Sequence, residues 1–71
     1  MNLIEGNKFD IKSLEHIIGQ FERDIEKTKA KPKTKKRAKY IKELESLIAY
    51  RKDKVRTLEI EIELEEIKGD K

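Results

Sequence analysis

The fold is decided by residues 11–28, which read IKSLEHIIGQFERDIEKT. Apolar side chains recur in this stretch at alternating steps of three and four residues, which is the spacing of one helix face and close to a coiled-coil seam. The residues with this spacing are Ile11, Leu14, Ile18, Phe21 and Ile25, followed by Thr28. The pattern predicts an amphipathic helix at residues 10–29, with Asp10 as its N-cap and Phe9 packed on Leu14 as a hydrophobic staple.

A second stripe with the same spacing occupies residues 35–67. Its members are Ile41, Leu44, Ile48, Val55, Leu58 and Ile62, with Arg51 at one position of the series. Pro32 separates the two stripes, because proline disfavours helical backbone at the residue before it. Two amphipathic helices with a short connection normally fold back on each other. We therefore predict an all-α fold, an antiparallel two-helix hairpin that resembles a coiled coil and has a longer second helix.

The predicted division of the chain has five parts. They are an N-terminal arm at 1–9, a first helix at 10–29, a basic connection at 30–34, a second helix at 35–67 with an acidic C-terminal extension, and a tail at 68–71. Residues 58–64 alternate strictly between apolar and acidic side chains, which is also a strand pattern. We expect a helix there, because leucine and glutamate are good helix formers and no turn signal precedes the segment.

Size and composition indicate a small protein that associates with itself. The chain has 71 residues and no cysteine, and 46% of it is charged while 35% is hydrophobic. A chain this small forms only a marginal hydrophobic core, which needs further stabilisation. Because the chain cannot form disulfides, association with a second subunit is the stabilisation that remains. We predict a homo-oligomer, in the simplest case a dimer. The sequence has neither a signal-peptide pattern nor an apolar run long enough to span a membrane, so we expect a cytoplasmic protein without a membrane partner.

The charges are divided along the chain in a way that opposes the helix dipole. Residues 27–42 hold nine basic side chains and no acid, whereas residues 59–66 hold five acids and no base. A helix favours acids at its start and bases at its end, so this arrangement in the second helix suggests an external partner. An antiparallel second copy would place each cluster beside the other. It would also cover Ile60, Leu64 and Ile67, which form a second apolar face away from the stripe.

The basic cluster is the strongest candidate site, because clustered lysines suit phosphate backbones, whose binding releases counterions. The candidate nucleic-acid or anion-binding residues are Lys29, Lys31, Lys33, Lys35, Lys36, Arg37 and Lys39. Only Tyr40 offers a nearby aromatic ring, so contact would be with the backbone and would tolerate any sequence. The alternative is a solvated loop, or a cluster that pairs with the acids of another copy.

Little in the sequence supports catalysis. There is no cysteine nucleophile, no glycine-rich phosphate loop and no zinc-binding pair of histidines, and the single histidine, His16, lies opposite the first stripe. The two-helix layout and residues 42–45, KELE, distantly resemble the small aspartyl-phosphate phosphatases of the sporulation phosphorelay. However, Ile41, Lys42 and Glu45 replace the serine, glutamine and aspartate of that family's motif. We therefore predict a protein that is not an enzyme and uses no metal or cofactor.

Together these features predict a small regulatory or adaptor protein without catalytic activity. Its expected partner is nucleic acid or a nucleoprotein, bound through the basic connection at the tip of the hairpin. The alternative is an inhibitor or assembly factor, for example of phage type, that inserts the face formed by Ile60, Leu64 and Ile67 into a partner protein. Retention on a polyanion that depends on salt would distinguish the two.

Overall fold

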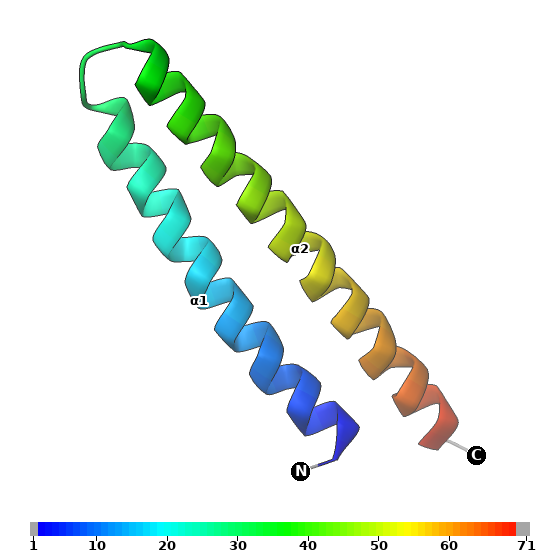
Figure 1. The fold of residues 1–71 in the computed structure, drawn as a ribbon. Helices are drawn as coiled ribbons and strands as arrows, with labels where there is room; N and C mark the ends of the chain where they lie inside the picture. Colours follow the sequence, from blue (N-terminus) through cyan, green and yellow to red (C-terminus); the bar gives the residue numbers. More distant parts are fainter. Residues whose placement is uncertain (1, 70–71) are drawn as a thin grey trace.

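The computed structural model describes residues 2–69, which form two helices lying side by side and antiparallel (Figure 1). Helix α1 spans Leu3–Lys29 and helix α2 spans Lys35–Gly69. The chain reverses in a short connection, so the start of α1 and the end of α2 lie together at the far end, called here the open end (Figure 1). The all-α hairpin with a longer second helix is confirmed.

Helix α1 begins at Leu3 instead of Asp10, so the predicted N-terminal arm at 1–9 is wrong for residues 3–9. Asn2 is the N-cap, and its Oδ1 accepts a hydrogen bond from the Glu5 backbone N–H at 2.8 Å. Asparagine is among the best N-cap residues, and an acid in the first turn suits the helix dipole. Asp10 therefore lies inside the helix. Phe9 does not act as a staple, since 63% of its surface is exposed.

The earlier start of α1 follows from two residues that extend the first stripe towards the N-terminus. Ile4 and Asn7 continue the steps of three and four from Ile11, but the polar side chain of Asn7 conceals the repeat in the sequence. Asn7 is buried, with 7% of its surface exposed. Its Nδ2 reaches α2 at the Leu58 carbonyl and the Glu61 carboxylate. The first turns of α1 are thus held against the last third of α2.

The core is a single seam between the two helices. Its buried members are Ile18, Ile25, Leu44, Ile48 and Val55, and Ile11, Leu14, Phe21 and Ile41 pack against them. These residues come from the two predicted stripes, which confirms the predicted pairing. No side chain among residues 2–69 is completely enclosed, because each helix covers only one side of the other. The hairpin therefore buries little apolar surface for its length.

Helix α2 continues without interruption through residues 58–64, so the strand alternative is wrong and the helical prediction is confirmed. It ends at Gly69, two residues beyond the predicted limit, and the rest of the predicted tail, residues 70–71, lies outside the described residues, as does Met1. Leu58 and Ile62 are half-buried on the side facing α1, and this packing selects the helical period over the alternating one. Neither α1 nor α2 is both long and apolar enough to cross a membrane.

Candidate nucleic-acid interface

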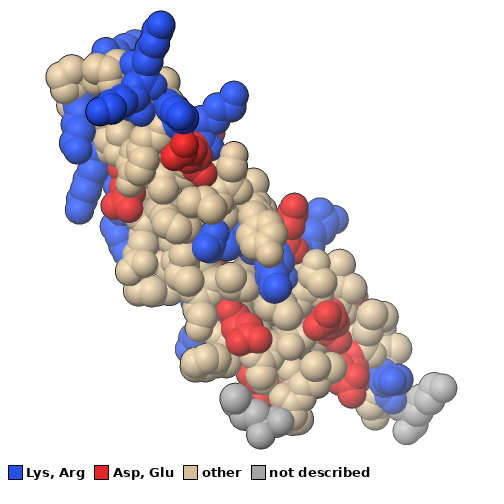
Figure 2. Space-filling model, in the orientation of Figure 1, with Lys and Arg blue, Asp and Glu red and all other residues tan. Residues whose placement is uncertain are grey.

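The candidate interface is the end of the hairpin where the chain reverses. We call its seven predicted anion-binding residues the basic tip. They are Lys29, Lys31, Lys33, Lys35, Lys36, Arg37 and Lys39. All are exposed except Arg37, which is half-buried. Figure 2 shows lysine and arginine side chains gathered at this end of the molecule. The structure therefore brings the seven predicted residues to one end of the hairpin.

Backbone caps hold the connection between the helices in shape. At the end of α1, the Lys31 N–H donates a hydrogen bond to the Thr28 carbonyl at 3.0 Å. At the start of α2, Thr34 acts as the cap: its Oγ1 accepts from the Arg37 N–H at 3.0 Å, and its carbonyl accepts from the Ala38 N–H at 3.1 Å. A threonine in this position satisfies one of the free N–H groups of the first helical turn. The cationic side chains are thus presented by a short, capped turn.

Arg37 has a structural role within the basic tip. Its guanidinium NH1 donates a hydrogen bond to the Lys31 carbonyl at 2.9 Å, which ties the first turn of α2 to the connection. Other N–H groups of the same guanidinium can still reach a phosphate, because arginine carries five donors. The exposed lysines act differently, as mobile point charges. The tip therefore combines one guanidinium, held by its hydrogen bond to the Lys31 carbonyl, with several exposed lysine side chains.

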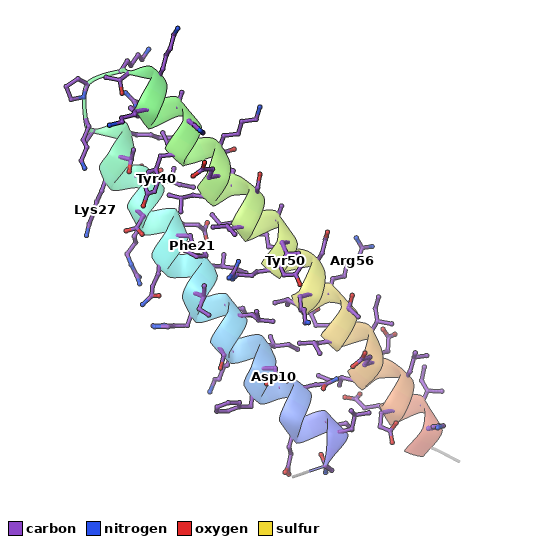
Figure 3. The ribbon with its side chains drawn as sticks, viewed as in Figure 1. Asp10, Phe21, Lys27, Tyr40, Tyr50 and Arg56 are labelled. Atoms are coloured by element: carbon purple, nitrogen blue, oxygen red, sulfur yellow. The ribbon has the colours of Figure 1, made fainter. Side chains whose placement is uncertain are left out.

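A shallow hollow lies on one side of the tip. It is lined by Thr28, Lys31, Pro32, Thr34, Lys36, Arg37 and Tyr40. Tyr40 is 45% exposed and belongs to the first two turns of α2, and its label in Figure 3 stands over the last turns of α1. The Thr28 hydroxyl is already used, since it donates to the Asp24 carbonyl at 2.7 Å. The hollow offers cations and one aromatic ring to a ligand. Thr34 was missed as part of the site, although a threonine directly before a helix is a recognisable cap signal.

The second predicted surface lies near the open end of α2. Ile60, Leu64 and Ile67 are exposed to 49%, 60% and 61%, as expected for side chains that the hairpin leaves uncovered. A shallow hollow beside them is lined by Leu64, Glu65, Ile67 and Lys68. These apolar side chains lie at the opposite end of α2 from the basic tip, so the structure does not combine the two predicted surfaces into one site.

Residues 2–69 contain no group of three or more histidine, cysteine, aspartate or glutamate side chains that could hold a metal ion. His16 is exposed, and its Nε2 lies 3.3 Å from the Gln20 amide nitrogen on the same helix. Comparisons of the chain with models of protein families, with curated proteins and with solved structures find no match. A functional conclusion therefore has to come from the surfaces of the hairpin.

Proposed function

We propose that this chain is a small regulatory or adaptor protein without catalytic activity, which binds nucleic acid or a nucleoprotein through its basic tip and acts as a homodimer. One observation carries the proposal. Six exposed lysines and Arg37 gather on a capped turn, within a stretch, residues 27–42, that contains no acid. A solvated loop does not require such a turn, whereas a phosphate backbone is bound best by cations held close together.

The chemistry of the tip favours phosphates over bases. Lysine binds phosphate as a point charge and reads no base edge, and the single arginine spends one donor on the Lys31 carbonyl. Tyr40 could stack on one base, but no second aromatic lies in the same hollow. Binding should therefore depend strongly on salt and only weakly on sequence. With about four to six phosphates neutralised, the logarithmic salt slope for duplex DNA would be roughly −4 to −5.

The test compares two variants with equal changes in charge. The tip variant carries Lys33→Glu, Lys35→Glu and Lys36→Glu, and the control carries Lys8→Glu, Lys12→Glu and Lys68→Glu, all at exposed positions. Fluorescence anisotropy with duplex and single-stranded oligonucleotides of random sequence, at several salt concentrations, measures the affinity. We expect the tip variant to bind at least ~10-fold more weakly with a flatter salt slope, and the control to keep the wild-type slope. Equal binding by both variants, or no binding by the wild type, would refute the proposal.

The alternative function is binding to a partner protein through Ile60, Leu64 and Ile67. It is favoured by the exposure of these side chains, 49–61%, on one end of a single helix. An amphipathic helix that presents such a face can lie in the groove of another protein. Because apolar burial would supply the affinity, Ile60→Lys would abolish this binding while added salt would change it little.

A further inference from the structure

The hairpin has two long sides next to the seam, and they differ in charge. Along each helix the seam residues come in pairs that are three residues apart. In an antiparallel pair of helices, the residues directly after the second member of each pair line one side of the seam. The residues directly before the first member of each pair line the opposite side. The residues after Leu14, Phe21, Thr28, Leu44, Arg51 and Leu58 are all charged. This charged side consists of Glu15, Glu22, Lys29, Glu45, Lys52 and Glu59. A shallow groove lined by Glu22, Lys29, Glu45 and Lys52 confirms that both helices contribute to it.

Over its middle, the opposite side carries apolar and aromatic residues together with two charged ones, Asp24 and Lys54, which directly precede the seam residues Ile25 and Val55. Ile17, Tyr40 and Leu47 directly precede the seam residues Ile18, Ile41 and Ile48, and Tyr50 lies one turn after Leu47. We call these four residues the tyrosine side. Leu47 and Tyr50 are 42% and 65% exposed, and Tyr40 is 45% exposed.

Some neighbours of these four residues are suited to a buried contact, whereas Glu43 and Lys54, one turn before Leu47 and one turn after Tyr50, are charged. On α1, the uncharged Ser13 and Gln20 lie one turn to either side of Ile17. Arg51 is folded back onto the protein: its NH1 donates to the Leu47 carbonyl at 3.2 Å, and its guanidinium carbon lies 5.1 Å from the centre of the Phe21 ring. Figure 3 labels Tyr40 and Tyr50 on α2 and Phe21 on α1. Exposed tyrosines beside aliphatic side chains are typical of the core of a protein interface, and the two charges on this side, Asp24 and Lys54, are of opposite sign.

We infer that a second copy of this chain covers the tyrosine side, with the two hairpins antiparallel, so that four helices form a bundle. The charges at the two ends decide the partner and its direction. If the tips lay together, the nine basic residues of 27–42 would face another nine. In the antiparallel arrangement, each basic stretch lies beside the five acids of residues 59–66 of the other copy. Like charges in contact are unfavourable, so the charges select the antiparallel direction.

The same complementarity appears on the tyrosine side itself. A crossing of the two α2 helices near Tyr50 brings together residues that are equally far before and after it. The Tyr40 hydroxyl then approaches Glu61 of the second copy, and Lys36 lies near its Leu64 and the acids on either side of that residue. On α1, the crossing falls near Ile17 and Gln20, so that Lys27 approaches Asp10 of the second copy. Each of these contacts occurs twice, as a twofold axis requires.

Glu61 is already oriented for such a contact. It directly precedes the seam residue Ile62 and so lies on the tyrosine side, towards the open end. Its Oε2 accepts a hydrogen bond from Asn7 Nδ2 at 3.0 Å, which holds the carboxylate near the seam. A carboxylate has room for further donors, so the Tyr40 hydroxyl or a lysine of the second copy can bind the other oxygen. The open end therefore presents a fixed acceptor to the opposing tip.

The size of this side suits a stable dimer. The Cα atoms extend over 58 × 15 × 13 Å, so one long side has an outline of roughly 900 Å². A standard interface buries about 800 Å² on each partner. Covering this side would enclose the seam on one flank and supply apolar burial that the hairpin lacks. Ile60 and Ile67 suit this role less well, because an antiparallel contact centred on them would bring the acids of 59–66 of both copies together.

Sedimentation equilibrium in the absence of nucleic acid tests the interface. The wild type should be a dimer, and Leu47→Lys with Tyr50→Lys should raise the dimer dissociation constant by roughly 100-fold or more. The matched control is Ile60→Lys with Ile67→Lys, which also introduces two lysines at exposed positions of α2 and should leave the dimer intact. Circular dichroism would establish that both variants remain helical. A monomeric wild type, or a dimer that is lost only in the control, would overturn the inference.

Cross-linking tests the direction, and the absence of native cysteine makes it clean. Lys36→Cys chains mixed with Leu64→Cys chains should form the mixed disulfide, because these positions lie about equally far from Tyr50. Lys36→Cys alone should cross-link poorly. Efficient self-linking of Lys36→Cys would show that the tips lie together and would overturn the antiparallel arrangement. Neither measurement contains nucleic acid, so the dimer and the nucleic-acid proposal can fail separately.

Discussion

Asn7 of α1 is joined to Glu61 of α2 across the seam, its Nδ2 donating to Glu61 Oε2 at 3.0 Å and to the Leu58 carbonyl at 3.4 Å. A buried asparagine in an otherwise apolar seam fixes which residues of two helices lie opposite each other, because any shift leaves its amide without a partner. No buried side-chain nitrogen or oxygen among residues 2–69 lacks a hydrogen-bond partner. Asn7 therefore fixes which residues of α1 and α2 lie opposite each other at the open end of the hairpin.

Asn7→Ala should lower the free energy of unfolding by about 1 to 2 kcal/mol, since it removes both hydrogen bonds and the side-chain packing. Asn7→Leu should recover most of this loss, because leucine suits a seam position. Urea unfolding at a fixed protein concentration measures both changes, and Lys8→Ala at the exposed neighbouring position is the control. If Asn7→Ala is as stable as the wild type, the first turns of α1 do not dock on α2 in solution.

Leu44→Ala should lower the free energy of unfolding by about 2 to 4 kcal/mol. Leu44 is 4% exposed and lies among the buried residues of the seam, so the substitution leaves a cavity there. Leu64→Ala removes the same atoms from a side chain that is 60% exposed and should change stability by less than about 0.5 kcal/mol. Thermal unfolding of the two variants compares them directly. Equal effects would mean that the helices pair through other faces.

Thr34→Ala should destabilise α2 by about 1 kcal/mol, because the Arg37 N–H loses the hydroxyl that caps it. Thr34→Asp keeps an acceptor and should retain the stability, yet it places an acid in the basic tip. In thermal unfolding Thr34→Asp should therefore be more stable than Thr34→Ala. In oligonucleotide binding Thr34→Asp should bind more weakly than Thr34→Ala. A stability of Thr34→Ala equal to that of the wild type would argue against the cap.

Lys35→Glu should stabilise the protein by roughly 0.3 to 1 kcal/mol, because the first turn of α2 contains no acid to complement the helix dipole. The same substitution should weaken oligonucleotide binding. Lys12→Glu, in the interior of α1, is the control and should give no gain in stability. Chemical unfolding at low and high salt measures the effect, which salt should diminish. A loss of stability in Lys35→Glu would mean that Lys35 makes a favourable contact within the protein.

The sequence by itself was sufficient for the two helices, their pairing and the position of the tip. Helical periodicity is a local property, and the stripes ending in Ile25 and beginning with Ile41 are separated by the unmistakable break at Pro32. The lysines of the tip were equally visible, because they are clustered within residues 29–39 of the chain. Their gathering at one end of the hairpin follows from the short connection alone.

Only the tertiary structure decided where α1 begins and how the two sides of the seam differ. Asn7 reads as a polar interruption of the stripe until its partners, Leu58 and Glu61, are seen more than fifty residues away. Likewise, the sequence drew attention to Ile60, Leu64 and Ile67, whereas Ile17 and Tyr50 come to share a side only once α1 and α2 are paired. The physical reason is that exposure and hydrogen bonding depend on contacts between distant segments, whereas helix formation and the reversal of the chain are determined by neighbouring residues.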